Sequence, residues 1–286
     1  MQDFNKKLTD KIIEQMETLG DDWLRPFGSI GGAPINAITG EHYTGSNYMM
    51  LSLFADCHVL ATYKQWQSVG AQVRKGEKGI QCFRYGKYKG ENSQGDEVTK
   101  QFCKYFKVFS ITQCDNVPEW IEQAAGLGES VDTTEVVKNI DDFIKNTKAK
   151  VTKGSPCYIP SEDTIQMPDR SSFVSNSDAS STSHYYSTFL HELTHWTKGP
   201  GRLDRKSGKR FGDPAYSFEE LIAELGAAML CARLGLDQSP TPDHAKYLNN
   251  WLKALQGDKD TKPDYTLITD AAKYAQAAVD HLLTYQ

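Results

Sequence analysis

The sequence lacks any apolar run long enough to cross a membrane. A membrane-spanning helix needs about 20 consecutive apolar residues, and no stretch of the 286 residues approaches that length. The opening residues, MQDFNKKLTDKIIEQMETLG, have the pattern of an amphipathic helix and lack the apolar centre of a signal peptide. We therefore expect a soluble protein that stays in the cytoplasm and has no membrane partner.

Paired cysteines and a strongly basic charge are absent as well. The six cysteines are spread along the chain without a C-x-x-C pair, so neither a cysteine zinc cluster nor a disulfide framework is indicated. The formal net charge is −5, which argues against a uniformly basic nucleic-acid-binding protein. An average over the whole chain can nevertheless conceal a local basic patch.

Residues 61–110 form such a patch, with ten basic residues against four acidic ones and nine aromatic residues in the same window. The segments IQCFRYGKYKG and QFCKYFKVFSIT have the pattern of strands, and GENSQGDE between them is typical of a hairpin loop. Cations that follow phosphates and flat rings that stack on unpaired bases are what single-stranded nucleic acid requires. Core aromatics and edge-protecting lysines produce the same composition, so both interpretations stay open.

The clearest chemistry lies in FLHELTHWTKG, residues 189–199. His191 and His195 are four residues apart, so both project from one side of a helix, as two ligands of one zinc ion must. Glu192 follows the first histidine by about 100° around the helix, which can place its carboxylate beside the open position of the metal. We therefore predict a metal site with two histidine ligands and with Glu192 as the general base. Histidines that only cap or cover the helix are the alternative.

A third ligand is offered by YSFEELIAELGAAMLCARLGL, which predicts a helix with an apolar stripe and two carboxylates four residues apart. We expect Glu220 to bind the metal and Glu224 to accept the ring N–H of a ligand histidine. Ser217 and Glu220 also fit a capping box, which would tie Glu220 to the helix start and leave Glu224 as the ligand. The small Ala223 lets a histidine helix approach closely and favours Glu220.

The chain divides where AAGLGESVDTTEVV replaces the aromatic pattern with small, polar and acidic residues. We predict an α+β fold of two domains, residues 1–128 and residues 129–286. The first combines an N-terminal helix, glycine-rich loops and the aromatic hairpin. In the second, two short strands in SPCYIPSEDTIQMP precede the histidine helix, and further helices follow.

These motifs together resemble two known groups of proteins. The pattern His191-Glu192-x-x-His195 followed by Glu220-Leu-Ile-Ala-Glu224 is similar to the zincin metallopeptidases of the gluzincin type. The segments CYIPSEDTIQMPDRSSF, YYSTFLHELTHWT and GRLDR resemble the peptidase domain of ArdC-type antirestriction proteins, which mobile elements such as plasmids and phages carry. NAITGEHYTGSNYMMLSL and TYKQWQSVGAQVRKGEKGIQCFRY resemble the single-stranded-DNA-binding domain of the same family, which also occurs beside plasmid primases.

The resemblance implies binding of single-stranded DNA by the first domain, a zincin fold in the second, and protection of incoming DNA from host restriction. It implies Zn²⁺ as the cofactor, with Mn²⁺ as the alternative, and a protein substrate for which host restriction components are candidates. The matching positions give candidate DNA contacts at Arg74, Lys75, Lys78, Lys64, Trp66, Tyr43 and Asn47. For Trp66 the alternative is packing in the core, and for Asn47 it is capping of the following helix.

Two classes of function stay open. In the first, the DNA-binding domain localises a zinc metallopeptidase on entering DNA, where it cleaves a bound or arriving protein. In the second, a binding module masks single-stranded DNA and the metal site is structural or vestigial. Glu192 favours the first, because a structural site does not need a general base. The sequence does not assign the group that stabilises the transition state, for which the candidates are His184, Tyr185, Tyr186 and Tyr216.

Overall fold

The computed structural model describes residues 2–20, 23–24, 30–91, 94, 96–124, 133–175, 179–206, 214–236, 245–257, 259 and 261–286. Helices and strands are mixed in this part of the chain, which confirms the predicted α+β class. Two compact units interleave along the sequence. Unit 1 comprises Met1–Ala33, Thr44–Leu53 and Ser130–Gln286, and unit 2 comprises Pro34–Tyr43 and Phe54–Glu129.

The compact units do not follow a single boundary after residue 128. The helix α1 (Gln2–Leu19) and most of α3 (Gly45–Phe54) pack in the same unit as the C-terminal half of the chain. Apolar residues of both helices, among them Leu8 and Met49, are fully buried. The division at residues 128 and 129 therefore stays a prediction about functional domains and does not describe the packing.

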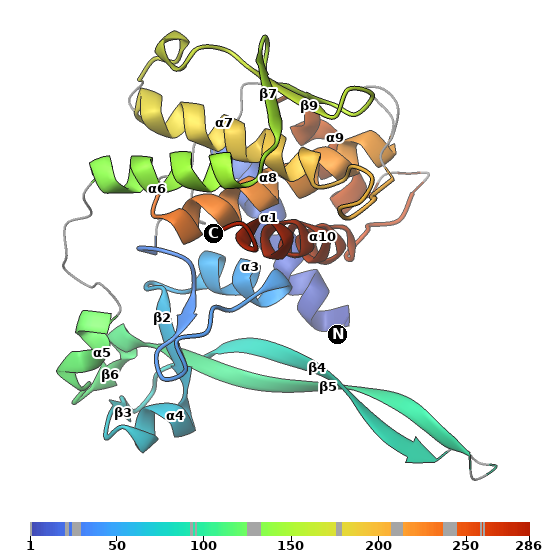
Figure 1. Ribbon diagram of the computed structural model, residues 1–286. Helices are drawn as coiled ribbons and strands as arrows, with labels where there is room; N and C mark the ends of the chain where they lie inside the picture. The colour runs from blue at the N-terminus through green and yellow to red at the C-terminus, as the bar shows by residue number, and fades with distance from the viewer. Residues whose placement is uncertain are drawn as a thin grey trace. The chain divides into compact units, whose positions relative to one another are not determined.

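Unit 2 is built on a four-stranded sheet with the strand order β1–β2–β5–β4. The strands β1 (Ile35–Asn36) and β2 (Val59–Thr62) are parallel, and the other pairs are antiparallel. The strands β4 (Ile80–Glu91) and β5 (Glu97–Ser110) form the hairpin that the sequence predicts. Figure 1 shows this hairpin as a long, twisted ribbon.

Short elements complete unit 2 beside the base of the hairpin. They are the helix α4 (Tyr63–Ser68), the paired strands β3 (Gln72–Val73) and β6 (Cys114–Asp115), the 3₁₀ turn η2 (Ile111–Gln113) and the helix α5 (Glu119–Ala124). A capping box fixes the start of α4, because Thr62 and Gln65 each accept a hydrogen bond from the backbone of the other. The small core of this unit gathers around Trp66, which is fully buried.

Unit 1 combines a three-stranded sheet with a layer of helices (Figure 1). The sheet has the order β7–β9–β8, with β7 at Lys150–Lys153, β8 at Cys157–Ile159 and β9 at Thr164–Met167. The strands β8 and β9 are the two short strands that the sequence predicts. The helices are α6 (Thr133–Asn146), α7 (Ser181–Trp196), α8 (Pro214–Leu234), α9 (Ala245–Gln256) and α10 (Leu267–Leu283). No helix in the described part of the chain is both long and apolar enough for a bilayer span.

The helix α8 lies at the centre of unit 1. Every residue from 219 to 231 is buried, because α7 and α10 both pack against this helix. A helix that is buried on all sides has no polar face, so the single apolar stripe predicted from the sequence is narrower than the buried surface. The polar groups that interrupt this surface, Glu219, Glu220 and Glu224, therefore need partners inside the protein.

A glycine of α8 permits the close approach of α7. A Cβ atom at Gly226 would lie 2.5 Å from Cγ2 and 2.8 Å from Oγ1 of Thr194, which is shorter than any normal contact. The Thr194 hydroxyl donates a 2.8 Å hydrogen bond to the carbonyl oxygen of Leu190 and is held in this position. The separation of the two helices is thus set by the absence of a side chain at Gly226.

We expect Gly226→Ala to destabilise the protein, although alanine is normally favoured over glycine inside a helix by about 1 kcal/mol. Overpacking of a core typically costs about 1–3 kcal/mol, and denaturant unfolding of the two proteins measures the difference. Thr194→Ala removes both clashing atoms. The double variant should therefore be more stable than the sum of the two single changes predicts. Simple additivity would show that the two helices are not in contact at this point.

Candidate metal centre and nucleic-acid interface

The helix α7 carries the two histidines into the interior of unit 1. The Ser180 side chain caps its start by accepting a hydrogen bond from the backbone N–H of Ser183. Residues 186–197 are all buried, and α7 packs on β8 and β9 on one side and on α8 on the other. The helix ends at Trp196, where the sequence predicts its end.

The two histidines meet Glu220 of α8 at one point. The Nε2 atom of His191 lies 3.6 Å from Oε2 of Glu220, and Nε2 of His195 lies 3.4 Å from Oε1. One ligand atom from each of the three residues lies within 4.8 Å of the others. Tetrahedral zinc with bonds of about 2.0–2.1 Å separates its ligand atoms by roughly 3.3–3.4 Å. The spacing and the chemistry of this donor set therefore fit a zinc-sized divalent ion.

A second carboxylate stands behind each histidine. The Nδ1 atom of His191 lies 3.3 Å from Oε1 of Glu224, and Nδ1 of His195 lies 3.2 Å from Oε1 of Glu219. A carboxylate at Nδ1 holds the proton there and leaves Nε2 as the metal-binding atom. The outer position predicted for Glu224 is thus where this side chain lies, and its effect on metal binding stays a prediction.

The capping-box alternative is wrong. The helix α8 begins at Pro214, so Ser217 lies inside the first turns and does not cap the helix. Its carbonyl oxygen accepts a 2.8 Å hydrogen bond from Nε1 of Trp251. Glu220 is consequently not tied to the helix start and faces the histidines instead.

Glu219 is the residue of this centre that the sequence analysis missed. Its carboxylate accepts hydrogen bonds from Nε and Nη2 of Arg205, at 3.2 and 2.9 Å. Arg205 also donates to the Thr197 hydroxyl at 2.7 Å and to the carbonyl oxygen of Thr194 at 3.0 Å. Because α7 and α8 run in opposite directions, the first histidine faces the last glutamate, and the second faces Glu219. The only sequence signal was the position of Glu219 directly before Glu220, because the antiparallel pairing itself is visible only in the structure.

The charges of this cluster stabilise one another. Burial alone would lower the pKa of His191, but the charge of Glu224 and the hydrogen bond to Glu220 raise it well above its usual value. For the acidic Glu219 the effects are reversed: burial alone would raise its pKa, yet the hydrogen bonds from His195 and Arg205 lower it to about 2. Burial would also raise the pKa of Glu220, but the charge of His195 and the hydrogen bonds from both histidines lower it, so this ligand is ionised at neutral pH, as binding of a metal cation requires.

Other polar groups surround the buried Glu192. Burial and the charge of Glu192 raise the pKa of Cys157, the first residue of β8. Burial raises the pKa of Tyr216, and the charge of Glu220 and a hydrogen bond to that side chain raise it further. Burial lowers the pKa of Lys198, against the opposing charges of Glu219 and Glu220. Tyr216 and Lys198 thus lie within electrostatic range of the carboxylates of the metal centre.

The other candidates for the transition-state group are held elsewhere. The Tyr186 hydroxyl donates a 2.6 Å hydrogen bond to Asp141 and accepts one from Arg170. Tyr185 packs edge-on against the ring of Tyr186. Residue His184 lies in the first turn of α7, more than one turn before the metal ligands. Of the four candidates, Tyr216 is the one that contacts the metal centre.

Two of the predicted DNA contacts, Trp66 and Tyr43, have roles in folding, and the capping role considered for Asn47 is not observed. Trp66 is fully buried and donates a 3.0 Å hydrogen bond to the carbonyl oxygen of Phe109, so the prediction of a base contact there is wrong. The Tyr43 hydroxyl accepts a hydrogen bond from Asn36 and donates to the carbonyl oxygen of Leu60. Asn47 is the third residue of α3 and is therefore not its N-cap.

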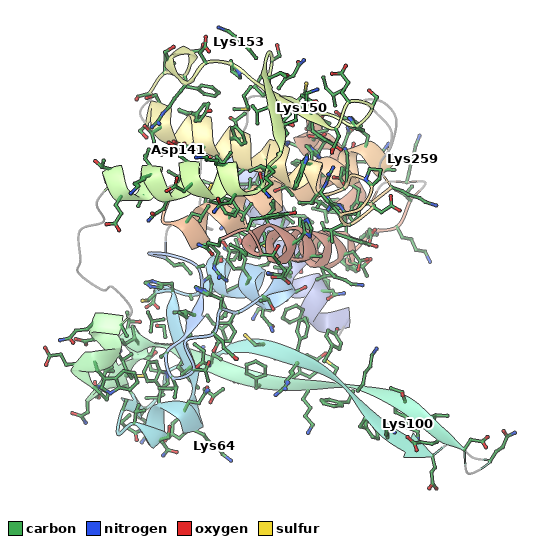
Figure 2. The ribbon with its side chains drawn as sticks, viewed as in Figure 1. Lys64, Lys100, Asp141, Lys150, Lys153 and Lys259 are labelled. Carbon is green, nitrogen blue, oxygen red and sulfur yellow. The ribbon has the colours of Figure 1, made fainter. Side chains whose placement is uncertain are left out.

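The predicted phosphate contacts divide into two kinds. The Arg74 guanidinium donates to Glu77, to Asp115 and to the carbonyl oxygen of Thr112, so its charge is compensated by one carboxylate of its own loop and one of β6. Lys75 and Lys78 are exposed. The same holds for Lys64, whose side chain extends away from α4 in Figure 2. All three lysines are therefore accessible from solvent, and their contact with phosphates stays a prediction.

A buried pair of helices that directs two histidines and a glutamate at one point defines a zincin-like domain. Residues 138–273 match the family model of a zincin-like metallopeptidase, and residues 2–109 match that of the N-terminal domain of anti-restriction factor ArdC. The metal-free crystal structure of the antirestriction protein ArdC from plasmid R388 is 36% identical, with a TM-score of 0.76 over 98% of this chain and 97% of that chain. The chain belongs to the ArdC antirestriction protein family, as its motifs predict.

Two further comparisons bear on the metal and on the wider family. The Mn(II)-bound crystal structure of ArdC from R388 is 34% identical to this chain, with a TM-score of 0.74 and the same coverage of both chains. The DNA primase TraC of Escherichia coli is 33% identical over 89% of this chain. The match spans 25% of TraC, so the chain corresponds to about a quarter of that relative.

We expect Glu220→Gln to abolish stoichiometric zinc binding, because it removes a ligand charge from the centre. Glu219→Gln should retain the metal with an affinity reduced roughly 10- to 100-fold, which is typical of a lost contact behind a ligand histidine. Competition with a chromophoric chelator measures both affinities, and circular dichroism verifies that each variant is folded. If Glu224→Gln loses the metal and Glu220→Gln keeps it, the ligand assignment is reversed.

Proposed function

We propose that this protein binds single-stranded DNA through unit 2 and cleaves a protein at a metal-dependent peptidase centre in unit 1. Together these activities protect incoming DNA from restriction, in line with the name of the antirestriction family. The observation that carries the proposal is the convergence of His191, His195 and Glu220 with Glu192 beside them. A purely structural site has no use for this additional buried carboxylate.

Each residue of the centre has a distinct task in this proposal. His191, His195 and Glu220 hold the ion, which is zinc or, as in one structure of the R388 relative, Mn(II). A divalent ion bound there polarises a peptide carbonyl and lowers the pKa of water. Glu192 accepts the proton of that water and delivers it to the leaving amine. Tyr216 donates a hydrogen bond to the negative charge that develops on the carbonyl oxygen.

The strand β8 is suited to align a peptide substrate. In the described part of the sheet β8 is an edge strand, with β9 on its one side, and α7 packs against it. Burial and the charge of Glu192 raise the pKa of Cys157 on this edge, which supports a substrate path close to the proposed general base. A peptide that adds to the edge by backbone hydrogen bonds would pass Glu192, which agrees with a protein as the substrate.

We expect Glu192→Ala to keep its metal, its stability and its DNA affinity, and to lose protection of an unmodified plasmid that enters a restricting host. The variant removes the proton acceptor and no ligand. His191→Ala should lose both the metal and the protection, and unit 1 should unfold more readily. Metal content and plasmid transfer efficiency are the measurements. Full protection by Glu192→Ala would overturn the peptidase proposal and favour masking of the DNA.

Binding of single-stranded DNA should weaken with salt, because lysines displace counterions from phosphates. About three contacts give a slope near −2 in a plot of log affinity against log salt. The triple change Lys64→Ala, Lys75→Ala and Lys78→Ala should flatten that slope, as measured by fluorescence anisotropy. The matched control replaces three exposed lysines of unit 1 (Figure 2) and should leave the slope unchanged: Lys150, Lys153 and Lys259. An equal effect of both triple changes would contradict the assignment.

A further inference from the structure

Unit 2 contains a hollow with an aromatic wall. The hollow has a volume of about 530 Å³ and is lined by Tyr63, Gln72, Val73, Arg74, Lys75, Gly76, Glu77, Phe109 and Asp115. Tyr63 from α4 and Phe109 from β5 meet edge to face, with ring centroids 6.4 Å apart. The Tyr63 ring is 40% exposed, and its hydroxyl accepts a 3.2 Å hydrogen bond from Gln72. An exposed ring is thus held in a fixed position.

The charges at this hollow nearly cancel. Arg74 forms ion pairs with Glu77 at 3.2 Å and with Asp115 at 3.4 Å, and Lys75 adds a single cation at the rim. A phosphate group would meet two carboxylates here. A flat and uncharged group, by contrast, finds the faces and edges of two rings together with polar atoms around them. The hollow therefore suits a nucleobase better than a phosphate.

One face of the hairpin continues the wall of the hollow. Alternate residues of a strand share a face and lie about 6.8 Å apart, so Phe109, Lys107 and Tyr105 of β5 lie on one face. The register pairs Tyr105 with Phe83 and Lys107 with Gln81, which adds Phe83 and Tyr85 of β4 to the same face. The rings of Phe83 and Tyr85 are 5.0 Å apart. Tyr85 and Tyr105 are 51% and 45% exposed.

The opposite face of the hairpin is less suited to stacking. Its Phe102 ring lies against Gly86, where a Cβ atom would come within 2.2 Å of the ring. The Lys104 ammonium stands 5.2 Å from the centre of the same ring. Nearer the base of the hairpin, Cys82 and Val108 of this face are fully buried. The Phe102 ring is therefore covered and Tyr88 is the exposed ring of this face, whereas the face of Tyr85 offers two exposed rings, Tyr85 and Tyr105, next to Lys107.

We propose that the hollow at Tyr63 and Phe109 holds a nucleobase, and that the strand of DNA continues along the hairpin face of Phe83, Tyr85 and Tyr105. This inference rests on the proposed binding of single-stranded DNA and names its base-stacking surface. The lysines of the same face and of the neighbouring loop, Lys107 and Lys75, hold the phosphates between stacked bases. Stacking accepts any base, so the track binds without sequence preference.

The test compares two tyrosines of one strand that point to opposite faces. Tyr85 and Tyr88 are 51% and 50% exposed, and the three-residue separation places them on different faces of β4. With a fluorescein-labelled oligothymidylate and the full chain, Tyr63→Ala and Tyr85→Ala should each weaken binding roughly 5- to 100-fold, as expected for a lost stacking contact. The slope with salt should not change. Tyr88→Ala should bind like the wild type, and Tyr63→Phe should retain the affinity because it keeps the ring.

An abasic oligonucleotide of equal length separates bases from phosphates. Tyr63→Ala and the wild type should bind it with equal affinity, because the probe has no base for the hollow. Wild-type affinity of Tyr63→Ala for oligothymidylate would overturn the base-holding hollow. An equal loss in Tyr85→Ala and Tyr88→Ala would overturn the assignment of the face. If the wild-type protein binds neither probe, the proposed DNA binding fails together with this inference. In the other two outcomes the wild-type protein still binds oligothymidylate, so the failure of the base-stacking surface can be told apart from the failure of DNA binding.

Discussion

The antiparallel packing of α7 against α8 is the constraint on which the metal centre depends. It encloses five ionisable side chains in one interface: His191, His195, Glu219, Glu220 and Glu224. Buried charges are tolerated when each has an opposite charge and hydrogen bonds, and every one of these groups has a partner within 3.6 Å. The set is therefore stable only as a whole, because removal of one member leaves its partner charged and buried.

The loop that follows α7 contacts α7, α8 and the three-stranded sheet around the metal centre. Arg202 stacks over the Trp196 ring at 4.0 Å, donates to the Trp196 carbonyl oxygen at 2.7 Å, and reaches Asp163 in the turn between β8 and β9. Arg205 holds Glu219 of α8. One short segment thus connects the three-stranded sheet, the histidine helix α7 and the glutamate helix α8. The motif GRLDR, which the sequence analysis only matched to a family, gains a physical role.

Local spacing could be interpreted from the sequence, whereas long-range partners could not. The pair His191 and His195 lies on one helix, so its geometry follows from helical repeat alone. Arg74 donates a hydrogen bond to Asp115, which lies 41 residues later in the chain, and no sequence periodicity predicts such a contact. Trp66 sits on a helix of six residues, which is too short to show which face is buried. The apolar face of α1 likewise did not reveal that its partners lie at the other end of the chain.

The charged groups of the two units lie in opposite environments: those of the metal centre in unit 1 are buried and paired, whereas many lysines of unit 2 are exposed to solvent. Unit 1 neutralises its histidines and glutamates in pairs away from water, where salt has little effect on the interaction. Unit 2 leaves lysines such as Lys75 and Lys107 exposed beside aromatic rings, where salt screens their charge and would weaken the proposed contacts with phosphates. An overall charge of −5 is compatible with both arrangements, because neither a buried cluster nor a local basic track depends on the average. Changes in ionic strength are therefore expected to act first on the exposed lysines of unit 2, where DNA binding is proposed, and to leave the metal centre nearly unchanged.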